Sequence, residues 1–263
     1  MSLVTTLRAA GCVFAEEEAA LILATASGPA EAARMATRRA AGEPLEHVLG
    51  WAGFLGLRIA VGPGVFVPRR RTEFLAGLAL LLMPPGARAV DLCCGAGALG
   101  AVLARHGAGE VHAADLDPAA VDCARRNLEP LGAHVHRGDL FAALPASLRG
   151  RVDVLVANVP YVPTGEVPLL PTEAREHEPL LSLDGGDDGL GVLRRVAGDA
   201  ASWLAPGGVL LSETSERQAP AALAAFAGAG LEARLAEDDD LGATVVLGTR
   251  PGGVRACRRS SAG

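Results

Sequence analysis

The 263-residue sequence contains no lysine, so all 24 of its basic residues are arginines. Aromatic residues make up only 3% of the chain, and Tyr161 is the single tyrosine. The formal net charge is −6, so the sequence lacks the basic excess that proteins bound to phosphate backbones usually carry. The low aromatic content and the lack of a basic excess disfavour a nucleic-acid-binding protein, and we expect no nucleic-acid partner.

Long apolar runs and a secretion signal are also missing. No run approaches the ~20 apolar residues that a membrane-spanning helix needs, and no basic segment precedes an apolar core at the N-terminus. The five cysteines form no Cys-x-x-Cys pair, and Cys93 and Cys94 are adjacent, which is poor geometry for a disulfide. We therefore expect a cytoplasmic protein with reduced thiols and no membrane contact. We also expect a monomer.

A regular alternation of helix and strand patterns is present instead. Residues 1–45 are predicted to form a small helical domain, and β-like runs at 46–73 (LRIAV and VFV) predict a hairpin linker. From 74 to 250, seven strands alternate with helices, which predicts an α/β doubly wound sheet. The last two strands are close enough in sequence to form an antiparallel pair. The tail at 251–263 is expected to be disordered.

A glycine-rich loop follows the first strand of this α/β domain. Gly95, Gly97 and Gly100 match G-x-G-x-x-G, in which glycine allows a sharp turn and close approach of a ligand. Asp115, at the end of the next strand, is placed to accept hydrogen bonds from ribose hydroxyls. This pattern fits enzymes of NAD and of S-adenosylmethionine (SAM). Asp91, just before the loop, favours SAM, because a carboxylate attracts the methionyl ammonium and repels a pyrophosphate.

Polar turns also end the third and fourth strands. In GDLF, Asp139 can accept a hydrogen bond from an adenine amino group and Leu140 can pack on the ring. In NVPY, Asn158 stands at the sheet edge where ligands bind in this architecture. Methyl transfer to a planar NH2 group needs acceptors for both N–H groups, which the Asn158 side chain and the next carbonyl supply. Pro160 stiffens the turn and Tyr161 can stack on the flat group.

The motifs DLCCGAG, DLD, GDLF and NVPY together resemble those of class I SAM-dependent amino-methyltransferases. Within these, the chain resembles the HemK/PrmC family, which methylates the side-chain amide of a glutamine in the GGQ loop of peptide chain release factors. Segments 42–73 and 176–196 are also similar to that family. The resemblance implies a Rossmann-like seven-stranded sheet, SAM as cofactor without a metal, a release factor as protein substrate, and an N-terminal helical domain that recognises it.

Residue roles follow from the resemblance by position. The residues expected to bind SAM are Asp91, Cys93, Cys94, Gly95, Ala96, Gly97, Asp115, Asp139, Leu140 and Asn158. Those expected to act on the substrate amide are Asn158, Val159, Pro160 and Tyr161. The chain departs from the family at Val159, where proline is usual, and at Arg70 and Arg71, where a proline and an acid are more common. These departures leave the identity of the substrate protein open.

Other functions stay open from the residues alone. The NVPY chemistry would also serve a flipped nucleic-acid base or another small amide or amine, and the glycine loop alone would serve an NAD-dependent oxidoreductase. His134 and His136 share a strand face without a third ligand, so no zinc site is expected. Ser212 and Ser215 lie near Glu213 without a histidine, so no hydrolase triad is expected.

Overall fold

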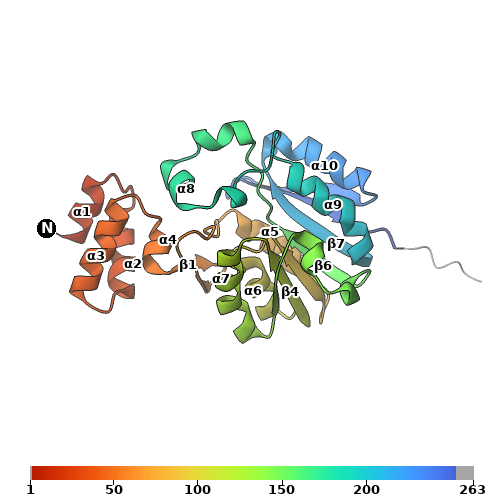
Figure 1. Cartoon of the computed structure of the whole chain (residues 1–263), viewed down its shortest axis with the longest axis horizontal. Coiled ribbons are helices and arrows are strands. Elements are labelled where there is room, and N and C mark those ends of the chain that lie inside the picture. The colour runs from red at the N-terminus through yellow and green to blue at the C-terminus, as the bar shows by residue number, and fades with distance from the viewer. Residues whose placement is uncertain (1, 253–263) are drawn as a thin grey trace, which may run out of the picture.

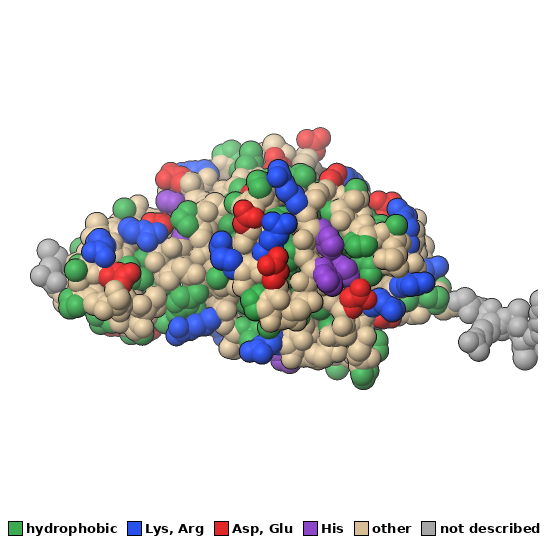
Figure 2. Space-filling view, turned by 60° about the horizontal axis from the view of Figure 1, so that its bottom comes forward, with side chains coloured by type: hydrophobic (Ala, Val, Ile, Leu, Met, Phe, Trp, Pro, Cys, Tyr) green, Lys and Arg blue, Asp and Glu red, His purple; other side chains and the backbone are tan. Residues whose placement is uncertain are grey.

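The computed structural model describes residues 2–252, so all but the first two residues of the predicted tail lie outside it. A small lobe of helices lies at one end of the molecule, and a larger α/β body makes up the rest (Figure 1). No helix within the described range is long and apolar enough to cross a bilayer. Basic and acidic side chains are interspersed on the face that Figure 2 shows.

Four short helices form the N-terminal lobe. Ser2 caps the first helix by accepting from the Thr5 amide, and Pro29 begins the third, where its missing N–H costs nothing. Their apolar faces bury Leu7, Ile22 and Met35 in a core separate from that of the sheet. The helices are α1 (Leu3–Ala9), α2 (Ala15–Thr25), α3 (Pro29–Ala40) and α4 (Leu45–Leu49).

A two-stranded hairpin follows, with β1 (Trp51–Phe54) antiparallel to β2 (Leu57–Ala60). Leu55 and Gly56 form its turn, both with positive φ (44° and 75°), as tight hairpins require. The prediction of a second strand at VFV was wrong, because residues 65–67 form no strand. The amide of Val67 donates to the Glu178 carboxylate instead of to a neighbouring strand.

The seven-stranded sheet confirms the predicted α/β class. Its strand order is β5-β4-β3-β6-β7-β9-β8, and β9 runs antiparallel to the other six strands. The predicted antiparallel pair at the C-terminal end is therefore confirmed. The strands are β3 (Arg88–Leu92), β4 (Glu110–Asp115), β5 (His134–Arg137), β6 (Val152–Ala157), β7 (Leu204–Thr214), β8 (Glu232–Asp238) and β9 (Ala243–Thr249).

Helices cover both faces of the sheet, which explains why β3 and β6 are almost wholly buried. One core packs the sheet against α5 (Thr72–Leu82), α6 (Ala98–Arg105) and α7 (Pro118–Leu128). The other packs it against α9 (Gly191–Trp203) and α10 (Ala219–Gly228). The chain order reverses between the adjacent strands β3 and β6, and ligands bind at the carboxyl ends of strands at such a switch point.

Candidate active site

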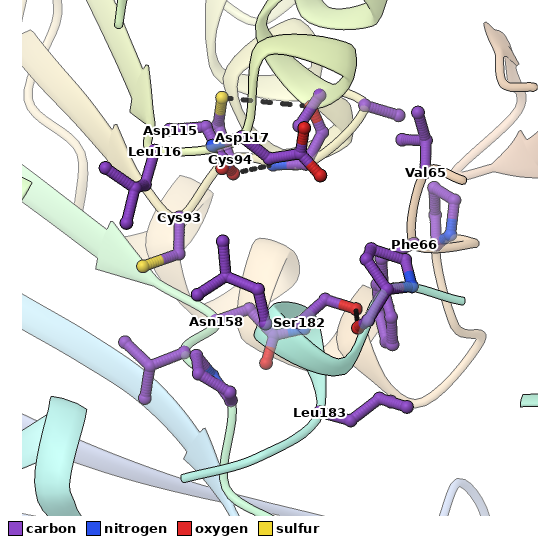
Figure 3. Close-up of a pocket in the computed structure, with 18 of the residues that line it drawn as sticks. Val65, Phe66, Cys93, Cys94, Asp115, Leu116, Asp117, Asn158, Ser182 and Leu183 are labelled. Carbon is purple, nitrogen blue, oxygen red and sulfur yellow. Dashed lines mark hydrogen bonds between the residues drawn. The ribbon is translucent and has the colours of Figure 1, made fainter. Parts of the chain in front are cut away.

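A cavity of about 550 Å3 opens at the carboxyl ends of β3, β4 and β6. Segments 64–72 and 170–183 complete its walls, the latter carrying the short helix α8 (Thr172–His177). Asp115, Cys93 and Cys94 lie on one side of it, with Val65 and Phe66 opposite (Figure 3). Of the predicted site residues, all but Gly97 line this cavity.

Gly97 serves the packing of the glycine loop rather than the cavity wall. It has a φ of +79° and caps the start of α6. A Cβ added there would lie 2.8 Å from Cδ1 of Leu128, on α7, and one on Gly100 would lie 3.3 Å from the same side chain. Glycine at both positions therefore lets α6 pack closely against α7. Cys93 has a φ of +54°, a strained value for a non-glycine residue.

Asp91 is fully buried and only half of its carboxylate is satisfied. Its Oδ2 accepts from the Gly100 amide at 2.8 Å, whereas Oδ1 has no hydrogen-bond partner among residues 2–252. Burial raises the pKa of Asp91 to about 7, and the nearby charge of Asp115 adds to the effect. Burying a carboxylate without a partner is costly, so the site suits a ligand that brings a cationic donor to Oδ1.

Asp115 is held rigidly beside the glycine loop. Its Oδ2 accepts from the Gly95 amide and its Oδ1 from the Asp117 amide, both at 2.9 Å. Burial raises the pKa of this carboxyl. Each oxygen keeps a second lone pair for a ligand hydroxyl. Burial also raises the pKa of the Cys93 and Cys94 thiols, so both remain neutral at neutral pH.

Asp139 has a partner that the sequence did not indicate. Its Oδ2 accepts from Nη2 of Arg195, on α9, at 2.6 Å, and both side chains line the cavity. Leu140, next in the chain, has a φ of +48°. Arg195 is thus a further residue at the edge of the cavity, and the hydrogen bond predicted from an adenine amino group to Asp139 stays a prediction.

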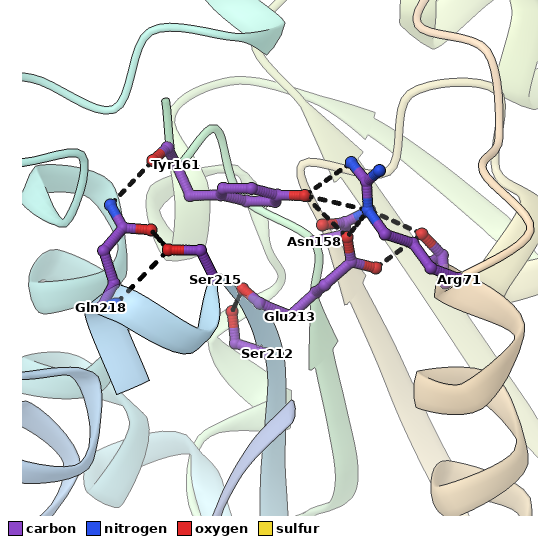
Figure 4. A network of polar contacts seen from close by, with 8 residues as sticks. Arg71, Asn158, Tyr161, Ser212, Glu213, Ser215 and Gln218 are labelled. Atoms are coloured by element: carbon purple, nitrogen blue, oxygen red, sulfur yellow. Dashed lines mark hydrogen bonds and ion pairs between the residues drawn. The ribbon is translucent and has the colours of Figure 1, made fainter. Parts of the chain in front are cut away.

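The side chains of Asn158 and Tyr161 belong to one polar network (Figure 4). Nδ2 of Asn158 lies 3.3 Å from Oγ1 of Thr72, whose hydroxyl donates to Glu213 at 2.7 Å. The Tyr161 hydroxyl donates to the same carboxylate at 2.8 Å and accepts from Arg71. Burial raises the pKa of Tyr161, and the charge of Glu213 raises it further. Sequence reasoning missed Thr72 and Glu213, which lie 86 and 55 residues from Asn158 along the chain.

Glycines of the segment after NVPY support its backbone. A Cβ on Gly185 would lie 2.6 Å from the Pro160 carbonyl oxygen, and one on Gly189 would lie 2.2 Å from that of Tyr161. Nε2 of Gln218 donates to the same Tyr161 oxygen at 2.9 Å. Val159 is buried in the second core. These contacts hold Val159, Pro160 and Tyr161 in place.

Three contacts tie the linker and the N-terminal lobe to the site. Glu178 accepts from the Val67 amide at 3.1 Å and from Arg69 at 2.5 Å. On the N-terminal lobe, Nη1 of Arg39 lies 3.4 Å from Oε1 of Glu173, and Glu173 lines the cavity. The third contact is made by a residue of α7, Asn127, which bonds both the backbone of Ala60 in the hairpin and the Ala96 carbonyl of the glycine loop.

The other polar groups considered from the sequence do not line the cavity. His112 joins His134 and His136 at the sheet edge, and its Nδ1 lies 2.8 Å from Nε2 of His136. No cluster suited to a metal ion occurs among the described residues. Ser212 donates to the Ala157 carbonyl and Ser215 bonds Gln218, so neither contacts a histidine.

The methyltransferase small domain family matches residues 57–170. A release factor glutamine methyltransferase of Streptomyces coelicolor is 41% identical over 69% of this chain and 66% of its own length, just under two thirds. That of Geobacter sulfurreducens is 37% identical over 83% of this chain and 77% of its own length. A 4-amino-L-phenylalanine/4-methylamino-L-phenylalanine methyltransferase of Streptomyces pristinaespiralis is 42% identical over 73% of this chain and 68% of its own length.

Solved structures of low sequence identity share the fold. A methyltransferase from Pyrococcus furiosus has a TM-score of 0.57 at 17% identity, covering 75% of this chain and 90% of its own. The architecture is thus that of the SAM-dependent methyltransferase fold.

Proposed function

Because this chain belongs to the release factor glutamine methyltransferase family, we propose that it transfers a methyl group from SAM to the side-chain amide nitrogen of a glutamine in a protein. The half-satisfied, buried carboxylate of Asp91 is the observation that carries this proposal. It supports a cofactor with an ammonium group, which SAM has and NAD lacks.

The other cavity residues fit the same cofactor. Asp115, whose carboxylate accepts from the Gly95 amide, would accept from ribose hydroxyls, and Leu140, which lines the cavity, would pack against the adenine. The neutral thiols of Cys93 and Cys94 line the wall without adding charge. SAM supplies an electrophilic methyl group on its sulfonium. The protein's task is to hold the acceptor nitrogen in line with that carbon–sulfur bond.

The NVPY residues carry out that task in the proposed reaction. The Asn158 side-chain oxygen and the Val159 carbonyl accept the two amide N–H groups, and Tyr161 stacks on the amide plane. As the nitrogen–carbon bond forms and the carbon–sulfur bond breaks, positive charge grows on the N–H groups that these acceptors hold. The nitrogen then loses one proton to solvent, so no strong base is needed.

Residues 1–45 are proposed to recognise the protein substrate, and the proposed substrate segment is the GGQ loop of a release factor. The contact of Arg39 with Glu173 supports this role, because it brings the helical lobe to the mouth of the cavity. Arg71, in the linker, donates to the Tyr161 hydroxyl. The linker therefore connects the mouth of the cavity to the residues proposed to act on the substrate amide.

A second acceptor class is a small aromatic amine. The 42% identity to a methyltransferase that acts on 4-amino-L-phenylalanine favours it, since an aromatic amine is also planar with a delocalised nitrogen lone pair. The Asn158 oxygen would hold such an amine as it holds an amide. A nucleic-acid base has the same chemistry, but the acidic net charge disfavours it.

An Asn158→Ala variant tests the proposed reaction. We expect it to bind SAM in calorimetry but to transfer methyl about a hundredfold more slowly, because one acceptor is lost. Methyl transfer to a purified release factor and to 4-amino-L-phenylalanine, measured side by side, decides the acceptor class. Full activity of the variant on either acceptor would contradict the assigned role of Asn158.

A further inference from the structure

We propose that Glu213 and Thr72 are positioning residues that fix which way the Asn158 amide faces. Glu213 is the second-last residue of β7 and Thr72 begins α5, so neither belongs to the NVPY motif. Both are buried, and together they turn the oxygen of Asn158 toward the cavity. The proposal rests on the proposed function, since it explains how the acceptor oxygen is presented to the substrate.

The direction of each hydrogen bond follows from the chemistry of the groups. Glu213 pairs with Arg71 and, as a carboxylate, only accepts. The Thr72 hydroxyl has one proton and donates it to Glu213 Oε2 at 2.7 Å. Its oxygen can then only accept from Asn158, at 3.3 Å. The NH2 group of Asn158 must therefore face Thr72, which leaves Oδ1 as the acceptor turned away from it.

The other carboxylate oxygen of Glu213 holds the far end of the motif. Oε1 accepts from the Tyr161 hydroxyl and from Nε of Arg71, both at 2.8 Å. One buried carboxylate thus fixes Asn158 through Thr72. The same carboxylate fixes Tyr161 directly (Figure 4). Its two oxygens accept from different side chains. A substitution at Glu213 that keeps the shape of the side chain can therefore change the direction of the hydrogen bonds without changing the packing.

A Glu213→Gln substitution is expected to reverse this chain of hydrogen bonds. Arg71 Nε–H faces the Oε1 position, so the glutamine oxygen must occupy it and the NH2 must face Thr72. The Thr72 oxygen then accepts from the glutamine, and its hydroxyl donates to Asn158. Asn158 flips, and a donor replaces the acceptor in the cavity. The shape of the side chain is unchanged, so the fold should be retained.

Kinetics provide the first test. Glu213→Gln and Thr72→Val should lower kcat about a hundredfold while the Kd for SAM changes by less than about twofold, because one transition-state acceptor is lost. Thr72→Ser keeps the hydroxyl and should restore kcat. The double variant should be no slower than Thr72→Val alone, because both changes break the same chain. Equal kcat values for Thr72→Val and Thr72→Ser would overturn the proposal.

The second test needs no substrate. The sequence contains only two asparagines, Asn127 and Asn158, and one glutamine, Gln218, so a 15N-labelled wild-type sample has three side-chain carboxamide NH2 groups, and Glu213→Gln adds a fourth. The Asn158 signals should shift in Thr72→Val and Glu213→Gln and stay in place in Thr72→Ser. Asn127, bonded to Ala60 and Ala96, is the internal control for the fold.

The two tests fail in different ways. If the wild-type protein methylates neither release factor nor 4-amino-L-phenylalanine, the proposed function fails, and the NH2 signals still decide the orientation. If the wild type is active and the Asn158 signals do not respond to Thr72→Val, the positioning role is wrong.

Discussion

An Asp91→Asn substitution should stabilise the ligand-free protein at alkaline pH while weakening its binding of SAM. A carboxyl whose pKa is higher in the folded than in the unfolded chain binds more protons when folded. Such a group destabilises the fold increasingly as pH rises from about 4 to about 7. Asp91, with a pKa of about 7 caused chiefly by burial, is such a group, and asparagine cannot ionise.

The magnitude follows from the two pKa values. Between pH 5 and pH 8, wild type should lose about 2.5 kcal/mol of unfolding free energy relative to the variant, since aspartate in unfolded chains has a pKa near 4. The cost of burying the asparagine NH2 is the same at both pH values and cancels in this difference. Urea unfolding of both proteins at the two pH values measures it.

The substitution should have the opposite effect on ligand binding, because the wild type should bind SAM more tightly than the variant does. SAM should bind the variant about tenfold to a hundredfold more weakly at pH 8, because a charge-assisted hydrogen bond to Oδ1 is lost. Wild-type affinity should fall as pH drops below about 7, where Asp91 takes up a proton. If the stability difference between the proteins does not change with pH and SAM binds both equally, the assignment of Asp91 to the SAM ammonium is wrong.

Four further substitutions test the packing and the ligand contacts around the site. Gly189→Ala should cost about 3 kcal/mol of unfolding free energy and abolish methyl transfer, because its Cβ would meet the Tyr161 carbonyl. Gly186 also has a positive φ but open space around it, so Gly186→Ala should cost about 1 kcal/mol in the same thermal unfolding assay. Asn127→Ala should cost about 2 kcal/mol and weaken SAM binding, because the hairpin is released from the glycine loop; unchanged stability would show that these bonds contribute nothing. Asp115→Ala should lower SAM affinity without unfolding the chain, and equal affinity in calorimetry would remove the ribose assignment.

Local patterns were sufficient to predict most of the sheet and the cavity. Continuous apolar runs predict buried parallel strands, and their polar terminal residues, Asp91, Asp115 and Asn158, meet at one edge because the strands are parallel. Gly97 is the exception among the residues predicted to bind SAM, because it belongs to the glycine loop but does not line the cavity. Its role depends on Leu128, whose position is set by how α7 packs, and no local pattern specifies that contact.

The missed residues share one property, which is that their role depends on distant parts of the chain. Thr72 and Glu213 read locally as a helix start and a strand end, and only the packing of α5 against β7 brings them to Asn158. The strand predicted at VFV failed for a similar reason, because Glu178, 111 residues away, takes the Val67 amide. Hydrogen bonds between distant side chains leave no periodic signal in the sequence.

The most direct measurement of the proposed reaction is transfer of radiolabelled methyl from SAM to a purified release factor. The acceptor is compared with a variant release factor whose GGQ-loop glutamine is replaced. We predict label on the wild-type factor and none on the variant, because the methyl group goes to that glutamine amide. Equal label on both factors, or none on either while SAM binding is demonstrated, would contradict glutamine methylation of release factors by this protein.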